Sequence, residues 1–109
     1  MTGNEYQRLA MRTCTQGSAV DKLRHGVFGL TAEAGEVAGI MQKLYQGHDF
    51  EMHHMKKELG DCLWMIAEIC TSMGVPMDEI MELNIDKLRA RYPNGFEAER
   101  SLHRKEGDV

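Results

Sequence analysis

Four carboxylates in the middle of the chain have the spacing of a metal site. Glu33 and Glu36 stand three residues apart, and so do Glu58 and Asp61. Residues three apart share one face of a helix. At about 100° of rotation per residue, Glu33 and Glu58 fall inside an apolar stripe, and Glu36 and Asp61 fall at its edge. Since carboxylates are rarely buried unless they are paired or bind a metal, both pairs indicate more than a solvated helix face.

If the two helices pack antiparallel, the four carboxylates converge and repel one another. At a separation of ~5 Å and an effective dielectric constant of ~20, each close pair repels by roughly 3 kcal/mol. A hard divalent cation offsets this repulsion, because Mg²⁺, with Mn²⁺ as a substitute, prefers carboxylate oxygens and water as ligands. The alternative is that both motifs are ordinary patterns of a helix surface. We predict a magnesium site held by Glu33, Glu36, Glu58 and Asp61.

Helical signals dominate the rest of the chain, and no segment shows the two-residue alternation of a strand. Gly47 and Asp49 are expected to end one long helix and begin the next. Four glycines inside the second helix predict close helix approach or room for a ligand. The predicted helices are one capped by Asn4, one over about 19–45 after Ser18, one over about 50–73, and one from Pro76 to about 92. We predict an all-α domain over residues 1–96 and a polar, flexible tail over 97–109.

The fourth predicted helix carries cationic side chains on its apolar side. With Ile80 as reference, Asn84, Lys87 and Arg91 fall within about 40° of it, on successive turns. Long Lys and Arg side chains can place their charged ends in water from such positions, which is the alternative interpretation. Together the three side chains indicate a ladder aimed at an anionic ligand.

Three further candidates have weaker signals. Trp64 is predicted to contact a substrate base, with packing or a subunit interface as the alternatives. His48 lies in the turn between the long helices, where it is either solvated or in contact with the substrate. Glu51 and His54 form one E-x-x-H motif, but di-iron carboxylate bundles need that motif twice, so we do not assign iron.

The composition narrows the class of protein. The 109 residues are 42% hydrophobic and 28% charged, with a formal net charge of −4, which argues against a general nucleic-acid binder. The chain has neither the apolar core of a signal peptide nor a run long enough to span a membrane. Its cysteines show no C-x-x-C pair and are interpreted as reduced, which favours a cytoplasmic protein. They are Cys14, Cys62 and Cys70.

The motifs also resemble those of MazG-type nucleoside triphosphate pyrophosphohydrolases. E-x-x-E, a spacer of twenty-one residues and E-x-x-D are followed by N-I-D-K-L-R-A-R-Y-P-N-G-F, similar to the ending N-x-x-K-L-x-x-R-Y-P-x-G-F of that family. The Y-Q-x-L-A-M-R-T opening and the Q-G-H-D turn resemble small single-domain members. The chain departs from the pattern at Ala32, where the family often has a further glutamate.

This resemblance implies a function and an assembly. Members hydrolyse ribonucleoside or deoxyribonucleoside triphosphates. Water attacks the α-phosphorus, and the products are the nucleoside monophosphate and pyrophosphate. Asn84, Lys87 and Arg91 match residues that contact the metal-bound triphosphate. A four-helix bundle completed in a homodimer or homotetramer is expected. From their charge and position, Glu33 and Glu36 are the candidate catalytic residues. One of the glutamates, with Glu36 at the stripe edge as first candidate, is expected to act as general base through water. The alternative is a non-catalytic helical module that binds a nucleotide or a protein.

Overall fold

A computed structural model of the chain describes residues 1–109, and its regular elements are all helices. In order they are α1 (Gly3–Ala10), the 3-10 turn η1 (Met11–Thr13), α2 (Ala19–Tyr45), α3 (Met52–Ser72), α4 (Met77–Arg91) and α5 (Ala98–Leu102). The predicted all-α class is confirmed. The chain forms two compact units, Met1–Met77 and Asp78–Val109, and each is described by itself.

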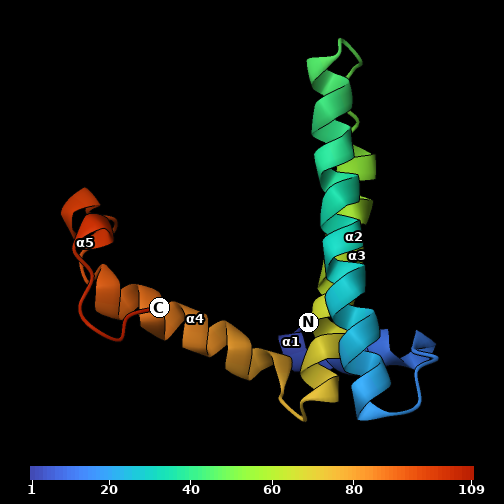
Figure 1. The fold of residues 1–109 in the computed structure, drawn as a ribbon, viewed down its shortest axis with the longest axis horizontal. Helices are drawn as coiled ribbons and strands as arrows, with labels where there is room; N and C mark the ends of the chain where they lie inside the picture. The colour runs from blue at the N-terminus through green and yellow to red at the C-terminus, as the bar shows by residue number, and fades with distance from the viewer. The chain divides into compact units, whose positions relative to one another are not determined.

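The first unit is built on an antiparallel hairpin of α2 and α3, the upright pair in Figure 1. Helix α2 begins where predicted, because the Ser18 hydroxyl accepts a hydrogen bond from the backbone N–H of Asp21 at 3.0 Å. The helix ends at Tyr45, and Gly47 takes a φ of +101°, which favours glycine. The chain then reverses, so the predicted antiparallel arrangement of the two carboxylate-bearing helices is confirmed.

Two predicted helix caps are wrong. Helix α1 is capped by Thr2 rather than Asn4: the Thr2 hydroxyl accepts from the Glu5 N–H, and the Glu5 carboxylate accepts from the Thr2 N–H. Helix α3 begins at Met52 after Glu51, which makes no side-chain cap, rather than after Asp49. The backbone is still extended at Glu51, so Asp49 lies too early to cap the first turn.

Two glycines of α2 allow the hairpin to close tightly. A Cβ at Gly26 would lie 2.7 Å from Cγ1 of Ile69, and one at Gly29 would overlap the side chain of Met65. A Cβ at Gly26 would also lie 3.2 Å from the Met65 carbonyl oxygen and would push α3 away, whereas one at Gly29 would displace the flexible Met65 side chain. The predicted close approach is therefore confirmed at these two positions. Nothing lies within 4 Å of a Cβ built at Gly35 or Gly39.

A buried polar cluster ties α2 and α3 to the segment before α2. Glu68 of α3 is fully buried, and both of its oxygens have partners. The His25 Nδ1–H donates to Oε1, and the Cys14 thiol donates to Oε2 at 3.1 Å. Burial, followed by the bond to Glu68, raises the pKa of the Cys14 thiol, so it stays protonated. The cluster satisfies a charge that would otherwise be costly to bury.

Replacing Glu68 with alanine is expected to lower the free energy of unfolding by about 2–4 kcal/mol, because it leaves a cavity and removes the hydrogen-bond partner that His25 and Cys14 share. Urea unfolding followed by circular dichroism measures this loss. The matched control is Glu79→Ala on the exposed face of α4, expected to stay within about 0.5 kcal/mol. Equal effects of the two changes would contradict a stabilising role for the cluster.

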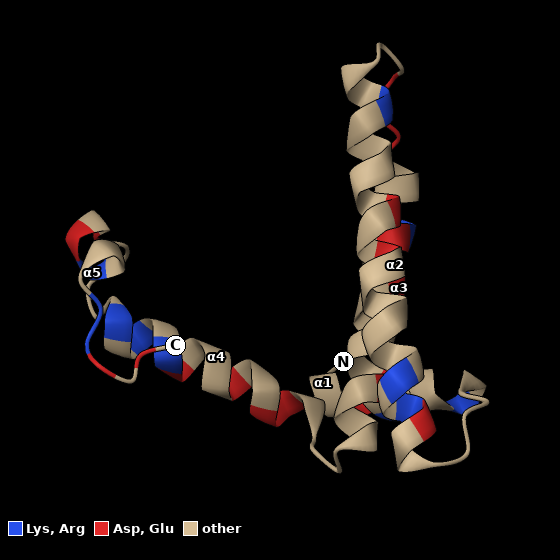
Figure 2. Ribbon diagram, in the orientation of Figure 1, with Lys and Arg blue, Asp and Glu red and all other residues tan.

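The second unit contains α4, a turn and α5. Helix α4 has Asp78 and Glu79 in its first turn and Arg89 and Arg91 in its last, which complements the helix dipole (Figure 2). Gly95 in the turn has a φ of +90°. The segment 97–109, predicted as a flexible tail, contains the short helix α5; its flexibility remains a prediction. None of the helices combines the length and the apolarity needed to cross a bilayer.

Candidate metal centre

Three of the four predicted metal ligands meet between α2 and α3. One carboxylate oxygen from each of Glu33, Glu58 and Asp61 lies within 4.8 Å of the others. Figure 2 shows acidic residues gathered about midway along the hairpin. The antiparallel packing brings together residues that are more than twenty positions apart, so the hairpin itself creates the cluster.

The carboxyl group of Glu33 has a raised pKa in this arrangement. Burial raises the pKa of its carboxyl, and the closeness of Glu58 and the charges of Asp61 and Glu36 raise it further. When all the carboxylates are ionised, only repulsion acts between them. The site therefore favours either a proton or a cation.

Glu58 supplies the clearest indication of a cation site. Its side chain is only 14% exposed, and Oε1 lies 3.2 Å from Nε2 of His54. Its other oxygen, Oε2, is buried and has no hydrogen-bond partner. Buried carboxylate oxygens without a partner are rare, because each loses its hydration without compensation. Three clustered carboxylates, one of which has an oxygen without a hydrogen-bond partner, fit a hard divalent ion such as Mg²⁺.

Glu36, the fourth predicted ligand, lies outside this group. It is exposed on α2, one turn after Glu33, and is near enough for its charge to raise the pKa of Glu33. The sequence pattern gave Glu36 and Asp61 equivalent positions at the edge of the apolar stripe, and the packing of α2 against α3 brings only Asp61 into the group. Its roles as ligand and as general base remain predictions.

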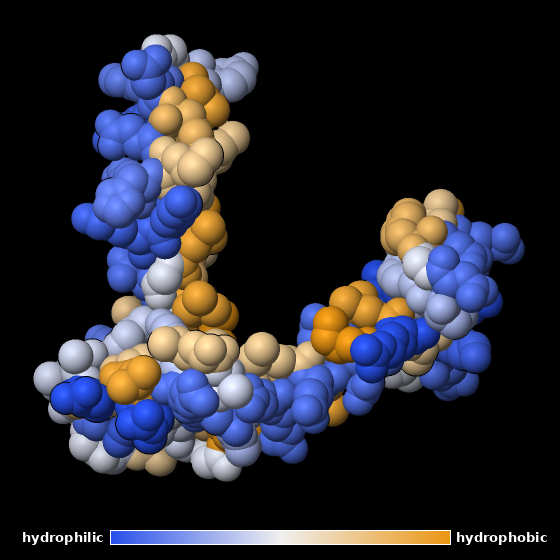
Figure 3. Space-filling view, turned by 180° about the vertical axis from the view of Figure 1, so that it is seen from behind, coloured by the Kyte–Doolittle hydropathy of each residue, from blue (hydrophilic) through white to orange (hydrophobic).

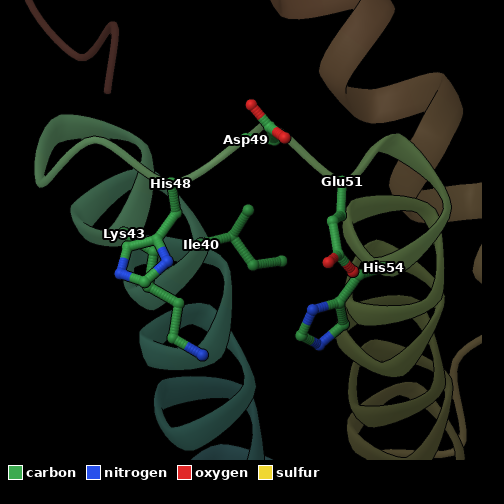
Figure 4. A pocket seen from close by; sticks show the side chains of 6 residues that line it. All are labelled: Ile40, Lys43, His48, Asp49, Glu51 and His54. Carbon is green, nitrogen blue, oxygen red and sulfur yellow. The ribbon is translucent and has the colours of Figure 1, made fainter.

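A cavity of about 170 Å³ lies at the tip of the hairpin (Figure 4), and His54, which lines it, is a hydrogen-bond partner of Glu58. His48, one of the predicted substrate contacts, also lines the cavity. Figure 4 shows His48 and Lys43 on the α2 side and Glu51 and His54 on the α3 side. The lining residues are Ile40, Lys43, His48, Asp49, Glu51 and His54.

Trp64, the other predicted aromatic contact, anchors the N-terminal segment. Its indole N–H donates to the Ala10 carbonyl and the Thr13 hydroxyl, both at 3.0 Å. Its ring meets the His25 ring edge-on, with centroids 6.1 Å apart. These contacts are those of the packing alternative, and a contact with the substrate remains a prediction.

The three predicted phosphate contacts lie in the second unit. Asn84 and Lys87 are exposed on α4. The Arg91 guanidinium holds the Asp108 carboxylate with two hydrogen bonds, from Nε at 2.9 Å and from Nη2 at 2.7 Å. This pairing raises the pKa of Arg91 and lowers that of Asp108, which the charges of Arg104 and Lys87 lower further. Arg91 thus binds the carboxylate oxyanion of Asp108, and the charges of Arg104 and Lys87 stabilise the same carboxylate.

Sequence reasoning missed two contributions to this region. His54 was considered only as part of an iron motif, although its spacing of four residues before Glu58 predicts contact on one helix face. Glu68 and His25 were not singled out. Glu68 lies seven residues after Asp61, on the same face of α3. This spacing was the feature of the sequence that could have identified Glu68.

The fold and the site define an all-helical protein with a carboxylate cluster suited to a divalent cation. A model of the MazG nucleotide pyrophosphohydrolase domain matches residues 26–96, and the chain belongs to this family. It is also similar to the Gene 37 protein of Mycobacterium phage L5, with 27% identity over 82 residues that cover 71% of this chain and 72% of that protein. No solved structure matches the chain.

Proposed function

We propose that the protein is a magnesium-dependent nucleoside triphosphate pyrophosphohydrolase that converts a (deoxy)nucleoside triphosphate to the monophosphate and pyrophosphate. The observation that carries this proposal is the cluster of Glu33, Glu58 and Asp61 with a buried, unpartnered oxygen on Glu58. Membership of a family described as nucleotide pyrophosphohydrolases supports the choice of substrate and bond. Mn²⁺ is expected to replace Mg²⁺ at such a site.

The proposed reaction is hydrolysis at the α-phosphorus. The oxygen of water forms a bond to the α-phosphorus, the bond to the oxygen bridging the α- and β-phosphorus breaks, and pyrophosphate leaves. Glu36, exposed one turn from the cluster, takes the proton of the water on its carboxylate. When bound, Mg²⁺ supplies positive charge that offsets the phosphate charge and makes a nearby water easier to deprotonate. Glu33, Glu58 and Asp61 hold that ion.

Substrate contacts are proposed from the charged residues of α4. Lys87 and Arg91 bind phosphate oxygens and offset the charge that develops on them, and Asn84 adds a hydrogen bond. The two hydrogen bonds from Arg91 to Asp108 support this role, since a carboxylate and a phosphate present similar paired oxygens to a guanidinium. His48 and Trp64 are retained as proposed contacts to the nucleoside.

A homodimer or homotetramer is part of the proposal. Large apolar side chains of the hairpin are exposed, and Figure 3 shows apolar atoms along the arm formed by α2 and α3. Extended apolar surfaces of this kind usually mark interfaces. The exposed residues include Val27, Phe28, Met41, Leu59 and Leu63. A second copy covering them would complete the helical bundle.

A panel of ribo- and deoxyribonucleoside triphosphates tests the function. We expect release of pyrophosphate with Mg²⁺ and none with EDTA. Binding of a nucleotide without any product across the panel would instead support the non-catalytic module.

Lys87→Ala and Arg91→Ala are expected to raise KM or lower kcat about tenfold or more, without weakening Mg²⁺ binding to the free protein. Asp108→Asn is expected to lower KM, because it frees the Arg91 guanidinium for phosphate. Steady-state kinetics and a Mg²⁺ titration check both expectations. Unchanged kinetics with a lower melting temperature would favour the alternative in which these side chains only extend into solvent.

A further inference from the structure

We propose that His54 is a positioning residue for the metal ligand Glu58. Its Nε2–H holds Oε1 of Glu58 and leaves Oε2 free for the divalent ion. This inference rests on the proposed function, because it assumes that the carboxylate cluster binds a metal. It assigns a role to a residue that lies outside the E-x-x-E and E-x-x-D motifs of this chain.

The geometry supports a directed hydrogen bond. His54 precedes Glu58 by four residues on α3, so the two side chains lie on one face of the helix. Nε2 lies 3.2 Å from Oε1. An ionised carboxylate only accepts hydrogen bonds, so the imidazole must carry its hydrogen on Nε2.

The hydrogen bond gives the two carboxylate oxygens of Glu58 different roles. A glutamate side chain without a partner rotates among several conformers, and a metal that binds it must restrict that freedom. With Oε1 held by His54, the other oxygen of the same carboxylate is fixed in its buried position. That oxygen is the one without a partner. Partners of this kind commonly change metal affinity 10–100-fold.

The surroundings of His54 separate this role from a structural one. Its side chain is 44% exposed, and it also lines the cavity at the hairpin tip. It is not part of the packed seam around Gly26, Gly29 and Ile69. Loss of the imidazole is therefore expected to leave the melting temperature nearly unchanged, and metal affinity is the property that should respond.

Calorimetric titration of the nucleotide-free protein with MgCl₂, and separately with MnCl₂, tests the proposal. We expect His54→Ala to weaken binding about tenfold or more. His54→Gln, which offers an amide donor, is expected to recover part of the affinity. His53→Ala removes the neighbouring exposed histidine and serves as the matched control, with affinity within about twofold of wild type. If His54→Ala does not fold, His54→Leu takes its place.

Glu58→Gln distinguishes the two possible failures. If wild type binds neither ion, the proposed function itself has lost its metal site. If wild type binds, Glu58→Gln does not, and His54→Ala binds as tightly as wild type, only the positioning role is overturned.

Discussion

Glu58→Gln is expected to reduce turnover by about a hundredfold or more while leaving the helices intact, and Glu33→Gln is expected to do the same. Each change removes one negative charge from the cluster and almost no volume. Steady-state pyrophosphate release measures turnover, and circular dichroism checks the fold. Glu79→Gln, on the exposed first turn of α4, is the matched control and should keep wild-type turnover.

The size of the loss decides the assignment. A ligand change that left more than about a tenth of wild-type turnover would cost less than roughly 1.4 kcal/mol of the barrier. Such a small effect is typical of a residue near a site rather than one that holds its ion. It would mean that the substituted residue, Glu33 or Glu58, is not a metal ligand.

Mg²⁺ is expected to raise the stability of the folded protein by about 2.7 kcal/mol at a hundredfold excess over its dissociation constant, because it binds the folded cluster and not the unfolded chain. Melting curves with MgCl₂ and with EDTA measure the difference. Glu58→Gln should make the metal-free protein more stable than wild type, since one repelling charge is deleted. A wild type that gains nothing from Mg²⁺, together with a destabilised Glu58→Gln, would mean that the carboxylates face solvent.

The same cluster predicts a pH dependence of defined sign. Because the folded-state pKa of Glu33 is raised, its carboxyl binds a proton more readily in the folded protein than in the unfolded chain. Stability of the metal-free protein therefore falls as the pH rises from the unfolded pKa, about 4.3, through the raised folded value. The loss of stability is complete once the pH is above the raised folded value. We expect melting temperatures with Mg²⁺ and with EDTA to converge at mildly acid pH.

Local signals in the sequence predicted most of the first unit. Ser18 and Gly47 each act through their own backbone neighbourhood, so the two ends of α2 could be placed from residue type alone. The apolar periodicity likewise placed Glu33 and Glu58 on facing sides of the hairpin. Caps were less certain where two candidates compete, as Thr2 and Asn4 do, because the choice depends on which hydroxyl or amide reaches the free N–H.

Interactions between distant residues could not be predicted in this way. The bonds from His25 and Cys14 to Glu68 join residues more than forty positions apart, and the sequence gives no register between α3 and the segment before α2. The pairing of Arg91 with Asp108 depends in the same way on the path of the segment after α4. Helical angles alone also could not separate Glu36 from the three converging carboxylates, since the twist and tilt of the packed helices decide which edge position points inward.

Hydrolysis in ¹⁸O-labelled water tests the central claim most directly. Wild-type protein is incubated with the triphosphate panel and Mg²⁺, and the products are analysed by mass spectrometry. The account predicts nucleoside monophosphate and pyrophosphate in equal amounts, with the ¹⁸O atom in the monophosphate and no reaction in EDTA. Label in pyrophosphate, release of orthophosphate with a nucleoside diphosphate, or turnover that is unaffected by EDTA would contradict it.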